Sequence, residues 1–164
     1  MLPDVLVKIR PTARTARRAT VALALAAATA LGTAGTARAG AVGTTTIGSF
    51  SYELHGVGVQ VPVGCFLTHR IEGSGRRITD QFAGVDCVGI AATFSRFCNW
   101  RIDFTYTDTD NRTYRTSRGA THNSCSGDPL RHAAPQVLPK YGKACARFYV
   151  NGRQRASQCH SVVK

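Results

Sequence analysis

The chain has 164 residues, and its 21 Lys and Arg against nine Asp and Glu give a formal net charge of +12 at pH 7. This excess favours weak attraction to anionic polymers or surfaces, but it does not identify one. The six cysteines are separated by 21, 10, 26, 19 and 13 residues with no C-x-x-C pair, a spacing that argues against zinc or redox chemistry. The sequence therefore predicts no metal site and no cofactor.

The first 39 residues have the parts of a secretory signal peptide. A basic lead precedes an uncharged apolar run at 19–31, and Ala37, Arg38 and Ala39 form a small-x-small cleavage site. The run is 13 residues long, whereas roughly 20 are needed to cross a bilayer. We therefore predict a removed signal peptide at 1–39 and a single disulfide-rich β domain at 40–164, without a transmembrane segment in the mature chain.

The predicted location is secreted and extracellular. Arg17 and Arg18 raise the alternative of twin-arginine export, but the bulky apolar residues usual after that pair are missing, so general secretion is favoured. The richness in Ala, Arg and Gly indicates a bacterium with a GC-rich genome. Residues 40–164 keep 15 Lys and Arg and eight Asp and Glu, so the mature chain carries 15 minus 8, or +7.

All six cysteines lie in the exported part, and an even count in an oxidising compartment predicts three disulfides. Six cysteines allow 15 connectivities, which the sequence alone does not resolve. Local structure favours pairing across a turn at 73–75, at the base of a central hairpin, and across a C-terminal hairpin. The predicted pairs are Cys65 with Cys87, Cys98 with Cys125, and Cys145 with Cys159.

The first half of the mature chain predicts short strands. Residues 40–46 are small and polar, which indicates a frayed start. Strands are expected at 47–54 and 57–63, and Pro62, which lacks an amide donor, places the second at a sheet edge or lies near its end. Two further strands are expected at 65–72 and 76–87, with a bend near 83–84. Residues 89–97 are compatible with a helical turn or a strand.

The longest alternation of apolar and polar residues opens a predicted hairpin within 98–125, with its turn at 108–111. If the loop is odd in length, Tyr114 lies opposite Tyr106 and Thr116 opposite Phe104. If the loop is even in length, the polar side chains of Thr113, Arg115 and Ser117 lie opposite the apolar face instead. Burial of the aromatic face favours the odd loop.

A second hairpin is predicted around Asn151 and Gly152, a strong turn signal between extended runs. A strict two-residue loop would place Cys145 opposite Gln158, whereas a bulge at Gly152 would place it opposite Cys159. The bulged register is therefore predicted. Some seven to nine short strands indicate an all-β fold, a small antiparallel β-sandwich or barrel stabilised by three disulfides.

Four residues are candidates for catalysis, and two arginines for binding. His69 with Glu72, and Glu53 with His55, offer the acid and base of a ribonuclease, since such chemistry needs two proton-transfer groups and a cation. Arg76 and Arg77, next to the glycines at 73–75, offer a cradle for phosphate. Exposed polar residues and hairpin tips that have no catalytic or binding role show the same patterns.

Two other patterns have structural explanations. The oxygens at 108–111 resemble calcium ligands, but the loop lacks the glycine and distal glutamate of an EF-hand, so turn formation is favoured. Trp100, next to a cysteine in an alternating strand, is expected to pack in the core. No specific nucleic-acid motif is present, because basic segments lack the aromatic side chains on which bases stack.

The function class that these patterns favour is a secreted bacterial β module of unknown ligand, which binds at the cell envelope or outside the cell. Its partner would be an anionic envelope polymer or an extracellular protein, contacted through loops 73–77 and 126–142. The alternatives are a small secreted hydrolase, nuclease-like in chemistry, and a secreted protease inhibitor with a rigid loop beside Cys125. The sequence leans away from an enzyme.

Overall fold

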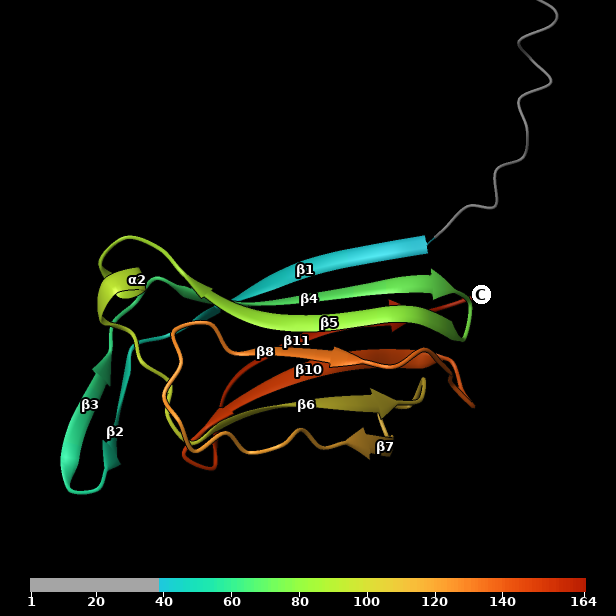
Figure 1. The fold of residues 1–164 in the computed structure, drawn as a ribbon. Coiled ribbons are helices and arrows are strands. Elements are labelled where there is room, and N and C mark those ends of the chain that lie inside the picture. Colours follow the sequence, from blue (N-terminus) through green and yellow to red (C-terminus); the bar gives the residue numbers. More distant parts are fainter. Residues whose placement is uncertain (1–38) are drawn as a thin grey trace, which may run out of the picture. The chain divides into compact units, whose positions relative to one another are not determined.

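The computed structural model describes residues 39–164, which form two antiparallel sheets, a separate hairpin and one short helix (Figure 1). Most of these residues are in strands, so the predicted all-β class is confirmed. The predicted signal peptide at 1–39 lies outside the described residues except for Ala39, which begins β1. Within 39–164, no helix has the length and apolar composition needed to span a bilayer.

The first sheet has the strand order β1-β4-β5-β8, with β9 also paired to β5. Its strands are β1 (Ala39–Ile47), β4 (Cys65–Ser74), β5 (Arg77–Cys87), β8 (Leu130–Ala133) and β9 (Gln136–Val137). Alternation along β4 explains its two faces, because successive side chains of a strand point to opposite sides. Leu67, His69 and Ile71 are buried, while Thr68 and Arg70 point outward.

The second sheet has the order β11-β10-β6-β7. Its strands are β6 (Trp100–Thr107), β7 (Thr113–Ser117), β10 (Gly142–Val150) and β11 (Arg153–Val162). The remaining elements are the hairpin of β2 (Phe50–Leu54) with β3 (Val57–Val61), and the helix α2 (Ile90–Phe94). Strand β6 lies between β10 and β7 in the sheet, and its side chains are buried on both faces from Ile102 to Thr107.

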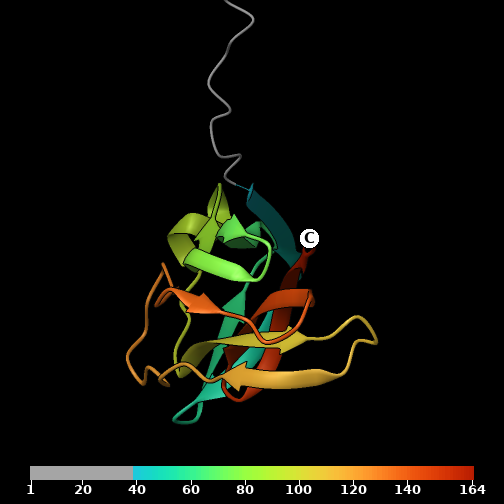
Figure 2. The same cartoon turned by 90° about the vertical axis from the view of Figure 1, so that its right-hand side faces the viewer.

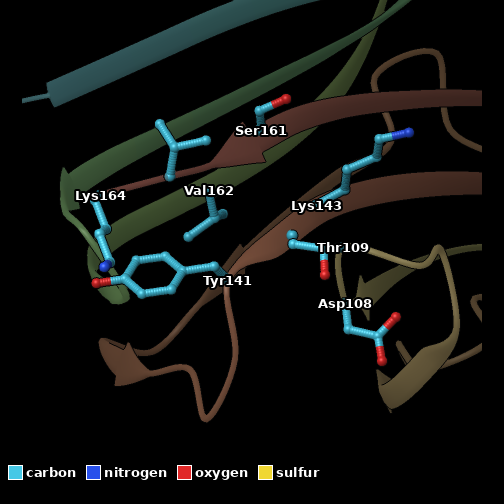
Figure 3. A pocket seen from close by; sticks show the side chains of 9 residues that line it. Asp108, Thr109, Tyr141, Lys143, Ser161, Val162 and Lys164 are labelled. Carbon is cyan, nitrogen blue, oxygen red and sulfur yellow. The ribbon is translucent and has the colours of Figure 1, made fainter.

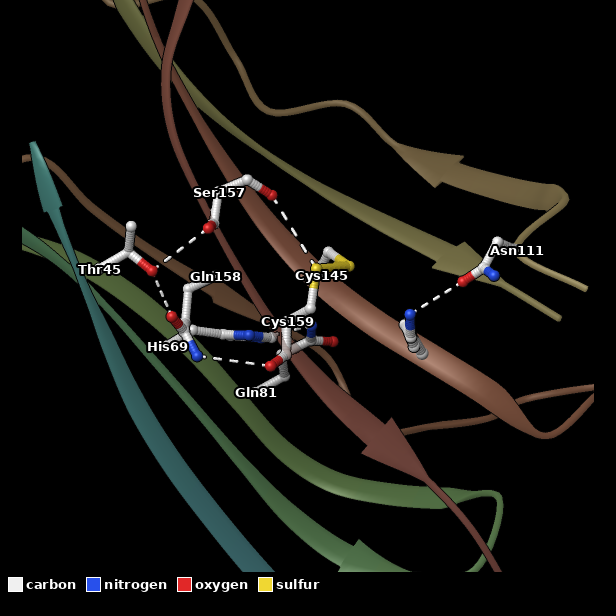
Figure 4. The surroundings of a disulfide bond; sticks show 9 residues. Thr45, His69, Gln81, Asn111, Cys145, Ser157, Gln158 and Cys159 are labelled. Atoms are coloured by element: carbon white, nitrogen blue, oxygen red, sulfur yellow. Dashed lines mark hydrogen bonds between the residues drawn. A yellow bond between two sulfur atoms is a disulfide. The ribbon is translucent and has the colours of Figure 1, made fainter. Parts of the chain in front are cut away.

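The two sheets share one core, and side chains close both sides of the space between them. On one side β11 lies against β1 and β4, and Thr45 donates a hydrogen bond to the carbonyl of Ser157 at 3.3 Å (Figure 4). On the other side Arg131 of β8 donates to the carbonyls of Ile102 and Ser117, each at 2.7 Å. Figure 2 views the sheets from the end that carries the β4–β5 turn.

Three disulfides join the cysteines, as predicted, and no cysteine among the described residues is free. The pairs are Cys65–Cys87, Cys98–Cys125 and Cys145–Cys159, the same pairs that the sequence analysis set out. Two of them join residues directly opposite each other on neighbouring strands, in β4 with β5 and in β10 with β11. Figure 4 shows the surroundings of Cys145–Cys159.

Two predictions about the N-terminal strands were wrong. Residues 40–46 are not frayed, because β1 pairs with β4 along its full length. Their small side chains hide the alternation, and Gly43 lies where a larger side chain would meet Gln158. The strand expected at 47–54 is divided, because Ile47 ends β1 and β2 begins at Phe50. The strand expected at 76–87 is present as β5, and 89–97, which the sequence left open, contains α2. Eleven strands are found in the described residues, more than the seven to nine expected.

The register predicted for the central hairpin was also wrong. The loop is odd, since Thr107 pairs with Thr113, but a bulge follows and places Arg115 opposite Tyr106. Tyr114 therefore leaves the ladder, packs its ring against the core, and donates its hydroxyl to the carbonyl of Lys140 at 3.3 Å. The aromatic face is buried by the facing sheet instead of by the partner strand.

The C-terminal hairpin has the predicted cysteine pairing but a different bulge. Asn151 and Gly152, with φ of 49° and 76°, form a two-residue turn, the geometry that Asn-Gly favours. The register shifts three residues later, at Arg155, so that Cys145 faces Cys159. The extra residue is absorbed within β11 because the turn itself needs none.

Candidate functional site

The two loops predicted as contact surfaces lie side by side at one end of the sheets. Arg77 pairs with Val137, and the amide of Leu138 donates to the carbonyl of Arg76 at 2.8 Å. Loop 73–77 and part of segment 126–142 therefore form one surface. In Figure 1 this end carries the β4–β5 turn, opposite to α2.

Arg76 is held in this surface, whereas Arg77 is free of ion pairs among the described residues. The Nη1 atom of Arg76 donates to the carbonyl of Pro139 at 2.7 Å, and its guanidinium lies 5.6 Å from the centre of the Tyr141 ring. Both arginines are exposed. The surface thus presents two guanidiniums that no carboxylate of residues 39–164 neutralises.

The turn after β6 lies at the same end, and Asp108 organises it. One oxygen of Asp108 accepts the amides of Asp110 at 3.1 Å and Arg112 at 2.9 Å. The hydrogen bond from the Arg112 backbone is the main cause that lowers the pKa of Asp108, and Lys140, 3.4 Å away, adds to it. The carboxylate is therefore committed to the turn, which is the structural role expected of a turn former.

A pocket of about 360 Å³ opens between this turn, the start of β10 and the end of β11 (Figure 3). Its apolar wall includes the Tyr141 ring, Val162 and Val163, and Lys143 and Lys164 stand at its rim. Lys143 donates to the side-chain oxygen of Asn111 at 2.9 Å, so its hydrogen-bond partner is neutral. The pocket combines an apolar wall with unneutralised positive charge.

These segments together form a surface that we call the basic end. It gathers six cationic side chains against two side-chain carboxylates, Asp108 and Asp110. The cations come from the β4–β5 turn, the turn after β6, the start of β10 and the end of β11: Arg76, Arg77, Arg112, Lys140, Lys143 and Lys164. Of these, Lys140 is ion-paired among the described residues. The excess of charge favours an anionic ligand.

The structure does not bring His69 and Glu72 together. His69 lies on the inner face of β4 and is fully buried, while Glu72 lies on the outer face, 3.9 Å from Arg70. Their separation by three residues along one strand places the two side chains on opposite sides of the sheet.

Glu53 and His55 are not on one strand face either. β2 ends at Leu54, and His55 is in the following turn with φ of 49°, which breaks the alternation on which the pairing depended. Both residues are exposed. Among residues 39–164, no histidine forms a hydrogen bond or ion pair with a carboxylate, which is the contact that the hydrolase alternative requires.

The structure shows a buried polar cluster that the sequence analysis missed. Tyr106 donates its hydroxyl to Oε1 of Gln81 at 2.7 Å, and the amide nitrogen of Gln81 donates to Nε2 of His69 at 3.1 Å. Gln136 donates to the Tyr106 hydroxyl, and His160 donates from Nε2 to the carbonyl of His69 at 2.8 Å. The inward positions of His69 and Gln81 in alternating strands were the available signal.

The electrostatics of this cluster indicate a structural role. Burial lowers the pKa of His69 to about 3, with a further contribution from the neighbouring His160. Burial also raises the pKa of Tyr106, although its hydrogen bond with Gln136 opposes the shift. Both groups are therefore neutral at pH 7, and the hydrogen bonds of this cluster join β4, β5 and β6, although Nδ1 of His69 has no partner among the described residues.

The segment just before Cys125, where the protease-inhibitor alternative places its loop, is exposed at 120–125. The segment before Cys125 is fastened to the body, since His122 exchanges backbone hydrogen bonds with Trp100, and Phe97 does so with Ser126. The Trp100 and His122 rings stack at 4.0 Å, and Trp100 is buried, as expected. Within the described part of the chain, no three His, Cys, Asp or Glu side chains gather as a metal site would require.

Comparison with protein-family models, with curated proteins and with solved structures found no match to this chain, so the functional argument depends on its own geometry.

Proposed function

We propose that this protein is a secreted bacterial β-sandwich module that binds an anionic polymer of the cell envelope through its basic end. The three disulfides support an oxidising, extracellular location. The net charge of +7 on residues 40–164 supports an anionic partner, obtained as 15 cations minus eight acids. A repeating polyanion suits an open surface better than a deep site, because it presents many charges along one chain.

The observation that carries this proposal is the convergence of Arg76 and Arg77 with the lysines of segment 140–143. These residues are far apart in the sequence, and Arg77 is joined to Val137 by strand pairing. Charges that solvate a surface are expected to be mixed with carboxylates, whereas here six cationic side chains accompany two side-chain carboxylates at one end. Convergence of like charge in the folded state costs free energy, which an anionic partner would offset.

The test measures binding of sodium polyphosphate and of polygalacturonate, one polymer with phosphate charges and one with carboxylate charges. The double substitution Arg76→Gln with Arg77→Gln is expected to weaken binding roughly tenfold, at about 0.7 kcal/mol for each exposed cation. The matched control is Arg118→Gln with Arg153→Gln, which removes the same charge from exposed positions elsewhere. It is expected to change the affinity by less than about twofold.

Added salt should weaken the binding, because exposed charges are screened over about 8 Å at physiological ionic strength. Equal losses in the two double variants would show that net charge alone attracts the polymer and that the basic end is not the site. Absence of binding to both polymers at low salt would reject the proposal itself.

A further inference from the structure

We infer that the pocket at the basic end binds a monomeric anionic amphiphile, a molecule with an aliphatic or aromatic body and one carboxylate or phosphate head. The inference deepens the proposed function and rests on it for the use of the basic end. It adds a ligand that enters the pocket, whereas a polymer would lie across the surface.

The wall of the pocket is suited to an apolar body. Tyr141, Val162 and Val163 line it, and the volume of about 360 Å³ is within the range of about 300–1,000 Å³ found for small-molecule sites. Val163 is 66% exposed, so the pocket leaves a large apolar side chain in contact with water. An apolar body that covers this wall gains the free energy of removing both surfaces from water.

Gly142 keeps the floor of this pocket close to the turn after β6. Its φ is +146°, and a Cβ at this position would meet the backbone of Thr107 and of Asp108. Any larger residue would push the start of β10 away from Asp108 and widen the pocket. The close approach at Gly142 therefore fixes the separation between the turn after β6 and the start of β10, which form two walls of the pocket.

The rim of the pocket is suited to an anionic head. Lys143 has the neutral Asn111 side chain as its hydrogen-bond partner, and Lys164 forms no ion pair among the described residues. The carboxylate of Asp108 also lines the pocket, but it is already engaged by two backbone amides and by Lys140. Figure 3 shows the two ammonium groups on opposite sides of the pocket, so a negative head group can lie against either lysine without breaking an existing ion pair.

The experiment is isothermal titration of the full mature chain with octanoate and with octyl phosphate, below their micelle concentrations. Octanol lacks the charge, and butyrate lacks most of the apolar body. Each is expected to bind at least about tenfold more weakly than octanoate, since both the head and the body contribute to the affinity. The two anions distinguish a carboxylate head from a phosphate head.

Two sets of variants locate the binding. Lys143→Gln with Lys164→Gln is expected to weaken both anions about fivefold and to leave the weak binding of octanol unchanged. Val163→Ser is expected to weaken octanoate about threefold through the lost apolar contact. Val42→Ser is the control, because Val42 is equally exposed, at 66%, on the outer face of the first sheet.

Unchanged affinity in both pocket variants, octanol binding as tight as octanoate, or no heat with either anion would each overturn the inference. A dimer in light scattering that the Val163→Ser substitution dissociates would show a second copy in the pocket and would also overturn it. A protein that binds polyphosphate but neither amphiphile rejects this inference alone. A protein that binds octanoate but neither polymer rejects the polymer proposal and retains the pocket.

Discussion

The two ends of the molecule differ in how they are held together and in what they expose. The end around α2 is covalently stabilised by Cys65–Cys87, and the amide of Val88 donates to the carbonyl of Gly64 at 2.9 Å. It exposes large apolar side chains, with solvent-accessible fractions from 59% to 73%: Val63, Val88, Ile90 and Phe94. The basic end is held mainly by hydrogen bonds and by the Lys140–Asp108 ion pair, and the nearest disulfide, Cys145–Cys159, lies two residues further along β10 and β11 from Lys143 and Ser161.

This difference separates stability from recognition. A disulfide stabilises a protein mainly by lowering the conformational entropy of the unfolded chain. The stability of the α2 end therefore depends less on specific contacts between surface side chains. The basic end depends instead on polar contacts that water, salt and a ligand can exchange. We therefore expect changes at the α2 end to alter the free energy of unfolding and changes at the basic end to alter binding. Each prediction below tests that separation.

The largest effect is expected from removal of the Cys65–Cys87 disulfide by substitution of both residues with Ala. The bridge closes a separation of 22 residues, for which the chain-entropy relation gives about 3 kcal/mol. For a domain of this size the melting temperature should fall by roughly 10 °C. Polyphosphate affinity, measured well below the transition, should not change. A loss of binding in the folded variant would contradict the separation of the two ends.

The second prediction concerns His69, which lies between the two ends in the shared core. Its pKa is lowered to about 3 in the folded protein, so below pH 6.5 the unfolded chain binds a proton that the folded protein excludes. The stabilisation is present above pH 6.5 and is lost as the pH falls. Between pH 7 and pH 5 the free energy of unfolding should drop by about 2 kcal/mol.

Urea titrations at the two pH values measure this drop. The variant His69→Gln should remove most of the difference, whereas His132→Gln, on the exposed outer face, should retain it. A free energy of unfolding that is the same at both pH values would show that His69 is not held neutral by the core.

A smaller effect is expected from Tyr106→Phe. The substitution removes the hydroxyl that donates to Gln81 and accepts from Gln136, which leaves the side-chain oxygen of Gln81 and the side-chain nitrogen of Gln136 only their 3.3 Å hydrogen bond to each other. The free energy of unfolding should fall by about 1–2 kcal/mol. Tyr149→Phe is the matched control, since that hydroxyl is exposed and lies 3.4 Å from Gln154, and it should cost less than about 0.5 kcal/mol. Equal costs would show that the buried cluster contributes no specific stability.

Periodicity and turn chemistry were sufficient to predict the strands that end in strong local signals. Asn151 and Gly152 fix their own turn, and Pro62 follows directly after β3, because both features depend on neighbours in the sequence. The register after the turn at 108–112 was not predictable in this way. It depends on Tyr114, whose ring packs on the core and whose hydroxyl reaches the carbonyl of Lys140, a contact between segments 26 residues apart.

The candidate site was predictable in part for the same reason. Arg76 and Arg77 were identified from a local cluster of glycine and arginine. Their proximity to Tyr141 and to the lysines near the start of β10 depends on the pairing of β5 with β9. Strand β9 has only two residues, which is too short for a pattern of alternating apolar and polar residues to predict it. His69 showed the reverse error, since its type suggested proton transfer while its inward position in β4 places it in the core.

The smallest effect is expected at the exposed helix of the α2 end. Ile90→Ser with Phe94→Ser removes two apolar side chains that are 73% and 66% exposed, while Ala91, the buried residue of α2, stays in place. Surface substitutions of this kind change the free energy of unfolding by less than about 0.5 kcal/mol each. Polyphosphate and octanoate affinities should equal those of the unsubstituted protein, as titration can measure. If either affinity fell, ligands would contact both ends, and the division between a stabilised end and a binding end would be incorrect.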